Sequence, residues 1–490
     1  MAQVPAQSPL QQRSAGILLH PTSLPGPGGC GTLGDDAYRF VDFLAAAGQQ
    51  IWQILPIGPT HSDGSPYQSL SVHAGEPALI SMVRLQQWGW LDRQIDLERR
   101  PRDQLIAMAR RHFLDCATDG ERDEWQQFLA RQHHWLADYA LFRVIRNLQQ
   151  QRGWCEWPIP LRDRDPAALQ QFAASAAEAI DTIRFEQFLF FRQWCQLKGY
   201  ANRHGVRIFG DMPIFVAHDS ADVWAHRSLF QLDAAGQPQV VAGVPPDYFS
   251  ATGQRWGNPH YAWAQMAGDQ FHWWQQRLAG QMELFDLVRI DHFRGFQAYW
   301  EIPASAATAI DGHWVEAPGA ALFSELQQRF SPLPVVAEDL GTITPEVLAL
   351  RDQFALPGMK ILQFAFDSGS DNPYLPHNHE ANSVVYTGTH DNDTTVGWYQ
   401  GLSGEAQAHI QHYLGHPDES IPWSLIRCAY HSVAQLAMVP LQDVMGLDGA
   451  HRMNTPGTNS GNWHWRFAWS QLAPDSAARL RELAALYGRL

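Results

Sequence analysis

Residues 285–296 read FDLVRIDHFRGF, an apolar, β-branched run that ends in charged side chains. The first half of this run is typical of a strand that is buried on both faces. Alternation along such a strand places Arg289 and Asp291 together on one face, opposite Ile290. The stretch therefore predicts a buried strand that carries an arginine and an aspartate to its carboxyl end.

Similar runs, rich in Val, Ile, Leu and Phe and bounded by Gly, Pro or Asp, recur along the chain and alternate with stretches of helical periodicity. The eight predicted strands are GILLH (16–20), QIWQILPI (50–57), VRIFGDMPIF (206–215), LFDLVRIDHF (284–293), LPVVAEDL (333–340), MKILQFAF (359–366), SVVYTGTHD (383–391) and AMVPLQDVM (437–445). Near-continuous apolar strands with helices between them predict a parallel sheet covered on both faces. Eight such units predict an α/β fold of the (β/α)8 TIM-barrel type, with an open doubly wound sheet as the alternative.

The predicted strands are unevenly spaced along the chain. The segment at about 58–205 is charged and helical in pattern, which predicts a mostly helical inserted subdomain. The segment at about 216–283 is rich in Pro, Gly and aromatic residues, which suits a rigid, substrate-binding surface loop. Because no linker or internal repeat divides the chain, we expect residues 1–490 to form a single catalytic barrel with these two insertions.

The composition excludes several classes of partner. The chain has 490 residues, of which 45% are hydrophobic, and a formal net charge of −15. Such a charge opposes binding to nucleic acid or an acidic membrane surface, because phosphate groups are bound largely by Lys and Arg. Five scattered cysteines, no apolar leader and no run long enough to cross a bilayer favour a cytoplasmic protein. The 20 tryptophans and 13 tyrosines, several in Gly- and Pro-rich stretches, suit a ligand with flat apolar faces.

Charged and polar residues follow four of the predicted strands at their carboxyl ends. In a TIM barrel these ends surround the mouth, where catalytic residues are found. We therefore expect one rim to carry Asp211, Arg289, Asp291, Glu338, Asp339, His390 and Asp391.

Two of these carboxyl groups have complementary surroundings. Arg289 favours the ionised form of Asp291, the form that acts as a nucleophile. Glu338 follows the apolar LPVV, and partial desolvation is expected to raise its pKa and keep a proton ready for donation. One ionised and one protonated carboxyl group are what a retaining displacement at a glycosidic bond requires. Asp391, beside His390, is expected to bind sugar hydroxyls more strongly in the transition state than in the ground state.

Structural alternatives exist for several of these residues. Arg289 and Asp291 taken alone could be a structural ion pair, although four charged strand ends together favour a catalytic site. Asp339 lies on the opposite strand face from Glu338, and could contact sugar or orient a neighbouring group. His390 could be a buried core histidine. The sequence shows no HExxH motif, Cys/His cluster or EF-hand loop, so no metal is expected.

Eight longer motifs, in order along nearly the whole chain, are similar to those of a known family. They are SPYQ (65–68), FGDMPIFVA (209–217), GVPPDYFSATGQRWGNPHY (243–261), RIDHFRG (289–295), AEDLG (337–341), GMKILQFAF (358–366), YTGTHDNDT (386–394) and NTPGTNSGNWHWR (454–466). On these motifs the chain resembles the 4-α-glucanotransferases of glycoside hydrolase family 77, in the α-amylase clan.

The resemblance implies specific roles for individual residues. Asp291 is implied as the nucleophile, Glu338 as the general acid/base and Asp391 as a third catalytic carboxylate, in agreement with the argument from strand ends. Tyr67 is implied to stack on the donor glucose. The residues implied to contact sugar hydroxyls or to orient the catalytic groups are Ser65, Asp211, Arg289, Asp339 and His390.

The acceptor side is also implied by the resemblance. Gln254 and Trp256 look like acceptor contacts, and the alternative for Trp256 is an aromatic anchor packed on the barrel. Asn462 is a further candidate contact, and its alternative is a role in turn geometry. The family does not generally depend on a metal or cofactor. Residues 467–490 have helical spacing, so we expect a terminal helix and no C-terminal β-domain.

The implied activity is retaining transfer of an α-1,4-glucan segment to the 4-hydroxyl of an acceptor glucan or glucose. The expected partners are α-1,4-glucans and maltooligosaccharides, with no nucleic acid and no membrane, and the oligomeric state is left open. The alternatives are an α-amylase-like retaining hydrolase and, from another class, a non-catalytic glucan-binding protein.

Overall fold

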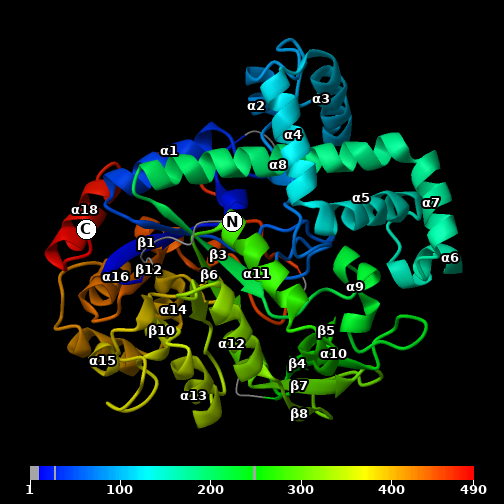
Figure 1. The fold of residues 1–490 in the computed structure, drawn as a ribbon. Coiled ribbons are helices and arrows are strands. Elements are labelled where there is room, and N and C mark those ends of the chain that lie inside the picture. Colours follow the sequence, from blue (N-terminus) through cyan, green and yellow to red (C-terminus); the bar gives the residue numbers. More distant parts are fainter. Residues whose placement is uncertain (1–9, 27–28, 247–249, 459) are drawn as a thin grey trace.

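An eight-stranded parallel sheet forms the centre of the molecule in the computed structural model, which describes residues 10–26, 29–246, 250–458 and 460–490 (Figure 1). Parts of three sequence features lie outside the described residues: the chain start (1–9), residues 247–249 of the aromatic segment, and Asn459. The sheet consists of β1 (Ser14–Leu18), β2 (Ile51–Gln53), β3 (Arg207–Pro213), β6 (Leu287–Asp291), β9 (Val335–Ala337), β10 (Gly358–Ile361), β11 (Ser383–Tyr386) and β12 (Leu436–Pro440). Each of the eight predicted strands overlaps one of them, although β1, β10 and β12 begin one or two residues before the predicted range.

The sheet closes into a barrel. Its order, β10-β11-β12-β1-β2-β3-β6-β9, is the chain order rotated by five strands, so β9 and β10 meet at the seam. There the Ala337 N–H donates to the Pro357 carbonyl at 2.9 Å. The Met359 N–H donates to Asp339 Oδ1 at 2.7 Å, so a side chain continues the ladder. The TIM-barrel prediction is confirmed, and the open doubly wound sheet is excluded.

Alternate residues of the strands fill the barrel interior, as period-two alternation requires. The buried interior cluster includes Ile51, Phe209, Leu287, Val336, Met359, Ile361, Val384, Tyr386, Leu436 and Met438. Gly16 of β1 is required here, because a Cβ at this position would lie 2.5 Å from the Ile51 carbonyl oxygen and 2.8 Å from Met438 Sδ. Residues with opposite parity, such as Trp52 and Ile290, pack outward against the helices.

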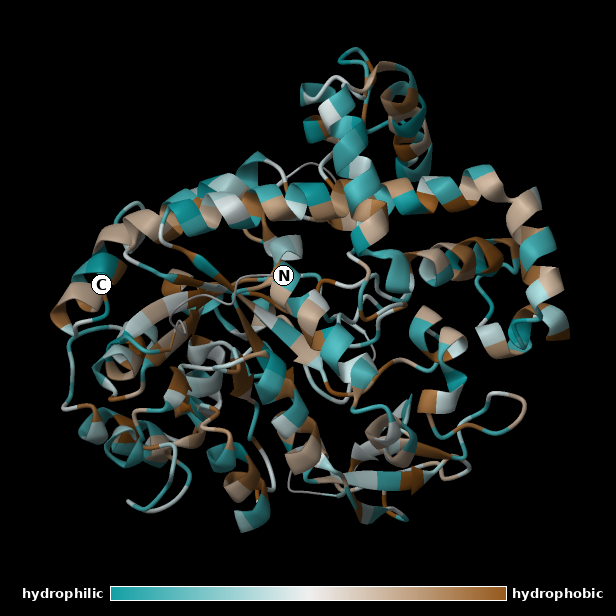
Figure 2. Ribbon diagram, in the orientation of Figure 1, coloured by the Kyte–Doolittle hydropathy of each residue, from teal (hydrophilic) through white to brown (hydrophobic). Residues whose placement is uncertain are grey.

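Helices cover the outside of the barrel, and Figure 2 shows the apolar strands inside their amphipathic layer. The covering helices are α1 (Asp35–Ala46), α8 (Ala177–Arg203), α11 (His272–Leu284), α12 (Gly319–Arg329), α13 (Pro345–Gln353), α14 (Thr395–Gly401), α15 (Gly404–Tyr413), α16 (Ile421–His431) and α18 (Ser476–Leu486). Only 3₁₀ turns, η6 (Leu362–Phe364) and η7 (Pro376–Asn378), separate β10 from β11. This connection contains Gly369, Asn372 and Pro376, which disfavour a helix interior.

The segment between β2 and β3 is mostly helical. It contains α2 (Met82–Gln87), α3 (Arg102–Cys116), α4 (Asp119–Arg131), α5 (His133–Leu148), α6 (Ile159–Arg162) and α7 (Pro166–Ser175). The long helix α8 then runs from these helices back to α1 on the barrel (Figure 1). Because α8 belongs to both parts, the helical insertion is joined to the barrel by a continuous helix.

The segment at 216–283, expected to be a loop, instead contributes two strands to a four-stranded antiparallel sheet. The sheet has the order β5-β4-β7-β8 and contains β4 (Val240–Val244), β5 (Gln254–Pro259), β7 (Ala298–Pro303) and β8 (His313–Glu316). Two strands of this sheet come from the predicted loop, and two follow β6. Glycine and proline in β4 and β5 hid the strand pattern, and β7, the second pairing partner of β4, lies outside the segment. Short helices α9 (Ala221–Ala225) and α10 (Trp263–Gly268) complete the segment.

The described chain beyond β12 consists of helices and turns and contains no strand. It includes α17 (Leu441–Met445), the 3₁₀ turns η8 (Gly449–His451) and η9 (Trp469–Gln471), and α18. The predicted terminal helix is therefore present over the shorter range Ser476–Leu486. Among the described residues, no helix is long and apolar enough to cross a membrane.

Candidate active site

Arg289 lies between two carboxylates at the mouth of the barrel. Asp211 of β3 is its direct partner across the parallel ladder. Its Nη1 is 2.6 Å from Asp211 Oδ2, and its Nη2 is 2.8 Å from Asp291 Oδ1. Burial alone would lower the pKa of Arg289, but Asp211 and then Asp291 raise it well above its usual value. The expected ion pair is therefore present, with a permanently charged guanidinium beside Asp291.

Glu338 lies beside this pair, on the neighbouring strand. Ile290 and Ala337 are partners in the β6–β9 ladder, so Asp291 and Glu338 follow at corresponding positions. The backbone N–H of His292 donates to Glu338 Oε2 at 2.6 Å, and that of Leu340 donates to Oε1 at 3.0 Å. Burial nevertheless raises the pKa of Glu338 to about 8, against Arg289 and the two N–H donors. This agrees with the expectation of a carboxyl group that holds its proton near neutral pH.

Asp391 follows β11 and is held through both carboxylate oxygens. Oδ2 lies 3.3 Å from His390 Nε2, and Oδ1 accepts a 2.6 Å hydrogen bond from Asn454 Nδ2. Burial opposes ionisation, but His390 and Asn454 outweigh it and lower the pKa of Asp391. Its side chain is still 42% exposed, which leaves the carboxylate open to a ligand.

Tyr67 joins the two sides of the mouth. It lies in the loop after β2, and its hydroxyl donates to Asp211 Oδ2 at 2.8 Å. The same oxygen is 2.8 Å from His390 Nε2. Because the single hydroxyl proton goes to Asp211, the imidazole N–H is the donor in the contact with His390. A continuous series of polar contacts thus runs from Asp391 through His390, Tyr67 and Asp211 to Arg289.

Gln254 and Trp256 lie on one face of β5, not in a loop as expected. Trp256 Nε1 donates to Gln254 Oε1 at 3.1 Å. The Trp256 ring meets the His292 ring edge-on, with centroids 4.9 Å apart and planes at 90°. Since His292 directly follows Asp291, this pair stands next to the end of β6.

Three of the predicted contact residues lie apart from this network. Both carboxylate oxygens of Asp339 are used at the barrel seam, one by Met359 and the other by Arg351 at 2.7 Å. The Asn462 amide is engaged in a local turn, accepting from the Thr455 N–H and donating to the Thr458 carbonyl. These contacts favour the structural alternatives for both residues. For Ser65, in the Tyr67 loop, the observed bonds involve the backbone.

Two residues at the site were given no role by reasoning from the sequence, although His292 was expected among the polar residues at the end of its strand. His292 has a left-handed backbone (φ 54°, ψ 49°), a conformation that the periodicity of the sequence does not predict. This conformation turns its N–H toward Glu338. Asn454 opens the motif NTPGTNSGNWHWR but carries no pattern of its own that predicts contact with Asp391. The only available signal was that the motif contains several polar residues without a predicted helix or strand.

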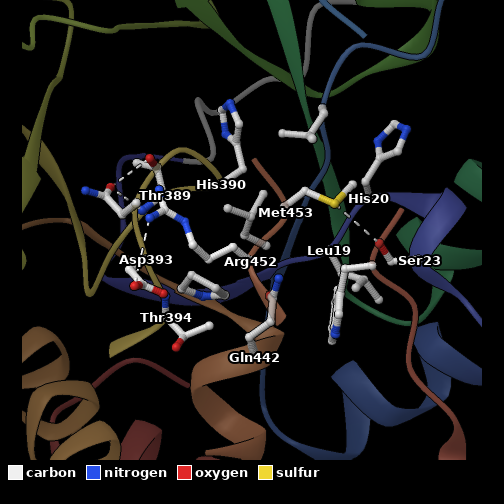
Figure 3. A pocket seen from close by; sticks show the side chains of 15 residues that line it. Leu19, His20, Ser23, Thr389, His390, Asp393, Thr394, Gln442, Arg452 and Met453 are labelled. Atoms are coloured by element: carbon white, nitrogen blue, oxygen red, sulfur yellow. Dashed lines mark hydrogen bonds and ion pairs between the residues drawn. The ribbon is translucent and has the colours of Figure 1, made fainter. Parts of the chain in front are cut away.

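A hollow adjoins His390, between the ends of β1, β11 and β12 (Figure 3). In Figure 3, Arg452 extends into its wall toward Asp393, and the paired atoms are 3.8 Å apart. The remaining wall combines apolar residues, Leu18, Leu19, Leu55, Pro440, Met453 and Trp465, with polar ones, His20, Ser23, Thr389, Asn392, Thr394 and Gln442. Within the described parts of the chain, no group of three or more His, Cys, Asp or Glu residues is arranged to hold a metal ion.

The barrel and its rim define a class of protein. Carboxyl groups at the ends of neighbouring strands, one beside an arginine and one buried with a raised pKa, are typical of barrel enzymes that act on glycosidic bonds.

Comparison with known proteins identifies the family. Residues 19–471 match the profile of glycoside hydrolase family 77, described as 4-alpha-glucanotransferase. The 4-alpha-glucanotransferase of Thermus thermophilus is 51% identical, over 98% of this chain and 99% of that protein. That of Synechocystis is 49% identical over the same shares. A solved structure, amylomaltase from Streptococcus agalactiae in complex with acarbose, has a TM-score of 0.93 and 37% identity over 98% of this chain and 100% of that one. The chain belongs to the 4-alpha-glucanotransferase family.

Proposed function

We propose that this chain transfers α-1,4-glucan segments by two displacements at the barrel mouth. In the first step, Asp291 attacks the anomeric carbon of the donor, and Glu338 gives its proton to the departing glycosidic oxygen. The bond from the anomeric carbon to that oxygen breaks as the bond to Asp291 forms. The product is a β-glucosyl-enzyme and a shortened glucan with a free 4-hydroxyl.

The second step reverses the first with a different acceptor. Glu338, now ionised, takes the proton from the 4-hydroxyl of an incoming glucan or glucose, whose oxygen attacks the anomeric carbon. Asp291 leaves, and the α configuration is restored. Asp391 binds sugar hydroxyls on the donor side, with His390 and Tyr67 beside it, and this contact strengthens as the ring distorts.

The observation that carries this proposal is the contrast between two neighbouring carboxyl groups. Asp291 lies 2.8 Å from a guanidinium nitrogen, whereas Glu338 is buried and has its pKa raised to about 8. A carboxylate paired with a cation and a buried neighbour that keeps its proton supply a nucleophile and an acid.

The acceptor side supports transfer rather than hydrolysis. Trp256 and Gln254 form a ready contact surface beside the end of β6, packed against His292. An aromatic ring that holds an acceptor sugar raises the effective concentration of its hydroxyl relative to water. Transfer and hydrolysis share the same first step, so the acceptor contacts decide between them.

Incubation with maltotriose tests the proposal. Two molecules are expected to give glucose and maltopentaose, followed by longer chains, with no net gain in reducing ends. A steady rise in reducing ends would instead support an α-amylase-like hydrolase, and binding without any product would support a non-catalytic glucan-binding protein.

A matched pair of variants tests the nucleophile. Asp291→Asn is expected to lower turnover by more than about 10⁴-fold while leaving glucan binding largely intact. Asp311→Asn makes the same change at an exposed position in the connection between β7 and β8, and is expected to keep full activity. Retained activity in Asp291→Asn would refute the assignment.

We also propose the cytoplasm as the place of action. All five cysteines, Cys30, Cys116, Cys155, Cys195 and Cys428, are free thiols, which suits a reducing compartment. Measuring the protein in soluble cytoplasmic and secreted fractions tests this proposal, and recovery in the secreted fraction would contradict it.

A further inference from the structure

Asn454 reaches the site from a distant part of the chain. It lies 63 residues after Asp391, in the turn that follows α17, and its Nδ2 donates to Asp391 Oδ1 at 2.6 Å. Its backbone N–H also donates to the His390 carbonyl at 3.2 Å. The Asn454 backbone is therefore tied to the peptide of the same segment whose carboxylate its side chain holds.

Arg452 reinforces the same contact. Its Nη2 donates to the Asp391 carbonyl at 2.9 Å, and its Nε donates to the Asn454 carbonyl at 3.2 Å. One guanidinium thus bridges the two loops, with Asp393 3.8 Å from its Nη1. The position of the Asn454 amide relative to Asp391 is fixed by the backbone as well as by the side chain.

The two oxygens of Asp391 have different partners. Oδ2 faces His390, and Oδ1 accepts from Asn454. The hydrogen bond from Asn454 on Oδ1 and the ring nitrogen of His390 beside Oδ2 together fix the rotation of the carboxylate, which contact at one oxygen does not. Because the side chain stays 42% exposed, the remaining lone pairs face the open side, where a sugar can bind.

We propose that Asn454 is a positioning residue, which holds the Asp391 carboxylate in the orientation that it needs to bind donor sugar hydroxyls. The inference rests on the proposed role of Asp391 as the third catalytic carboxylate. Arg452 supports it by locking the two loops together.

Asn454→Asp gives a test that depends on pH. At low pH, a protonated Asp at this position can still donate to Asp391 and replaces the amide. As the pH rises, that proton is lost, and two carboxylates about 2.6 Å apart repel each other. The variant is therefore expected to gain a new fall in kcat/KM between about pH 4.5 and 7, the range in which such pairs lose their shared proton.

The surrounding charged groups are the same in the wild type. The titratable and charged groups that face this pair are His390, Arg452, Asp393, Arg289 and Tyr67. Because these groups are present in both proteins, the ratio of variant to wild type isolates the effect of the new carboxyl group. The ratio is therefore the quantity to plot.

Two further variants complete the design. Asn454→Ala removes the hydrogen-bond donor at every pH. It is expected to lower kcat about 10- to 100-fold with little change in KM, and to add no new pH-dependent fall to the profile of kcat/KM. Asn382→Asp is the matched control, because it introduces the same charge at an exposed site before β11, and its profile is expected to keep the wild-type shape.

The outcomes separate this inference from the proposed function. If Asn454→Asp keeps the wild-type profile shape, or Asn454→Ala keeps wild-type kcat, the positioning role is refuted. If Asp391→Ala retains full transfer activity, the role of Asp391 in the proposed function is refuted, whatever the result for the Asn454 variants. An inactive Asp391→Ala together with a new limb in Asn454→Asp supports both.

Discussion

Replacement of Glu338 by Gln tests whether this carboxyl group keeps its proton in the folded protein at a pH where an exposed glutamate is ionised. The pKa of Glu338 is raised from 4.5 to about 8, chiefly by burial. At about 1.4 kcal/mol per unit, this shift corresponds to about 5 kcal/mol between the ionised and neutral forms. The folded protein therefore holds a proton over a range of pH in which the unfolded chain has lost it.

The sign of the effect follows from this difference. Between pH 4.5 and 8 the folded state binds more protons at Glu338 than the unfolded state does, so the wild type loses stability as the pH rises. Above pH 8 the whole of this loss in the free energy of unfolding is present. The Gln side chain cannot ionise, so the stability of the variant does not depend on pH through this position. Glu338→Gln is expected to gain about 2 to 3 kcal/mol relative to the wild type between pH 5.5 and 7.5.

Urea unfolding followed by tryptophan fluorescence at pH 5.5, 6.5 and 7.5 measures this difference. The amide also loses one of the two N–H bonds, from His292 or Leu340, but that cost is independent of pH. Glu482→Gln, exposed on α18, is the matched control and is expected to show a constant difference from the wild type. If Glu338→Gln also shows a constant difference, the folded protein does not hold this proton.

Three further predictions concern the polar contacts, the acceptor side and the barrel interior. Tyr67→Phe keeps the ring but loses the hydroxyl that touches Asp211 and His390, and kcat/KM for maltotriose is expected to fall about tenfold or more; an unchanged value would mean that the hydroxyl is not used. Trp256→Ala removes the ring beside His292 and is expected to raise the share of hydrolysis severalfold, measured as reducing ends per transfer, with an unchanged share as the contrary result. Gly16→Val places atoms against the Ile51 backbone and is expected to cost about 3 kcal/mol in unfolding free energy, whereas wild-type stability would contradict the close approach.

The barrel was predictable because its strands are continuous apolar runs. Such runs leave a clear signal in the sequence, and the charged residues at their ends belong to the same stretches. The antiparallel sheet left no such signal, because β4 and β5 contain Gly243, Gly257 and Pro259, and β4 also pairs with β7, which is distant in sequence. The helix missing after β10 was likewise hidden, since a predicted barrel assumes a helix in every connection.

The site was predictable only where it is built from strand ends. Period-two alternation placed Arg289 and Asp291 on one face, and the same rule turns Asp339 away from Glu338 toward the seam. Asn454 could not be found in this way, because its contact with Asp391 depends on how a loop folds back over 63 residues. The backbone of His292 was also unpredictable, since a left-handed residue after a strand is set by tertiary contacts.

The division of roles between Asp291 and Glu338 follows from where their partners come from. Arg289 belongs to the same strand as Asp291 and points to it directly, so the ionised form of Asp291 has a charged partner at 2.8 Å. Glu338 accepts hydrogen bonds only from backbone N–H groups, and neither these nor the charge of Arg289 offsets its burial. Asp211, which itself accepts a hydrogen bond from Tyr67, holds the other side of Arg289, so the guanidinium is not free to turn toward Glu338. The acid and the nucleophile therefore differ because a single arginine is committed to one of two neighbouring strands.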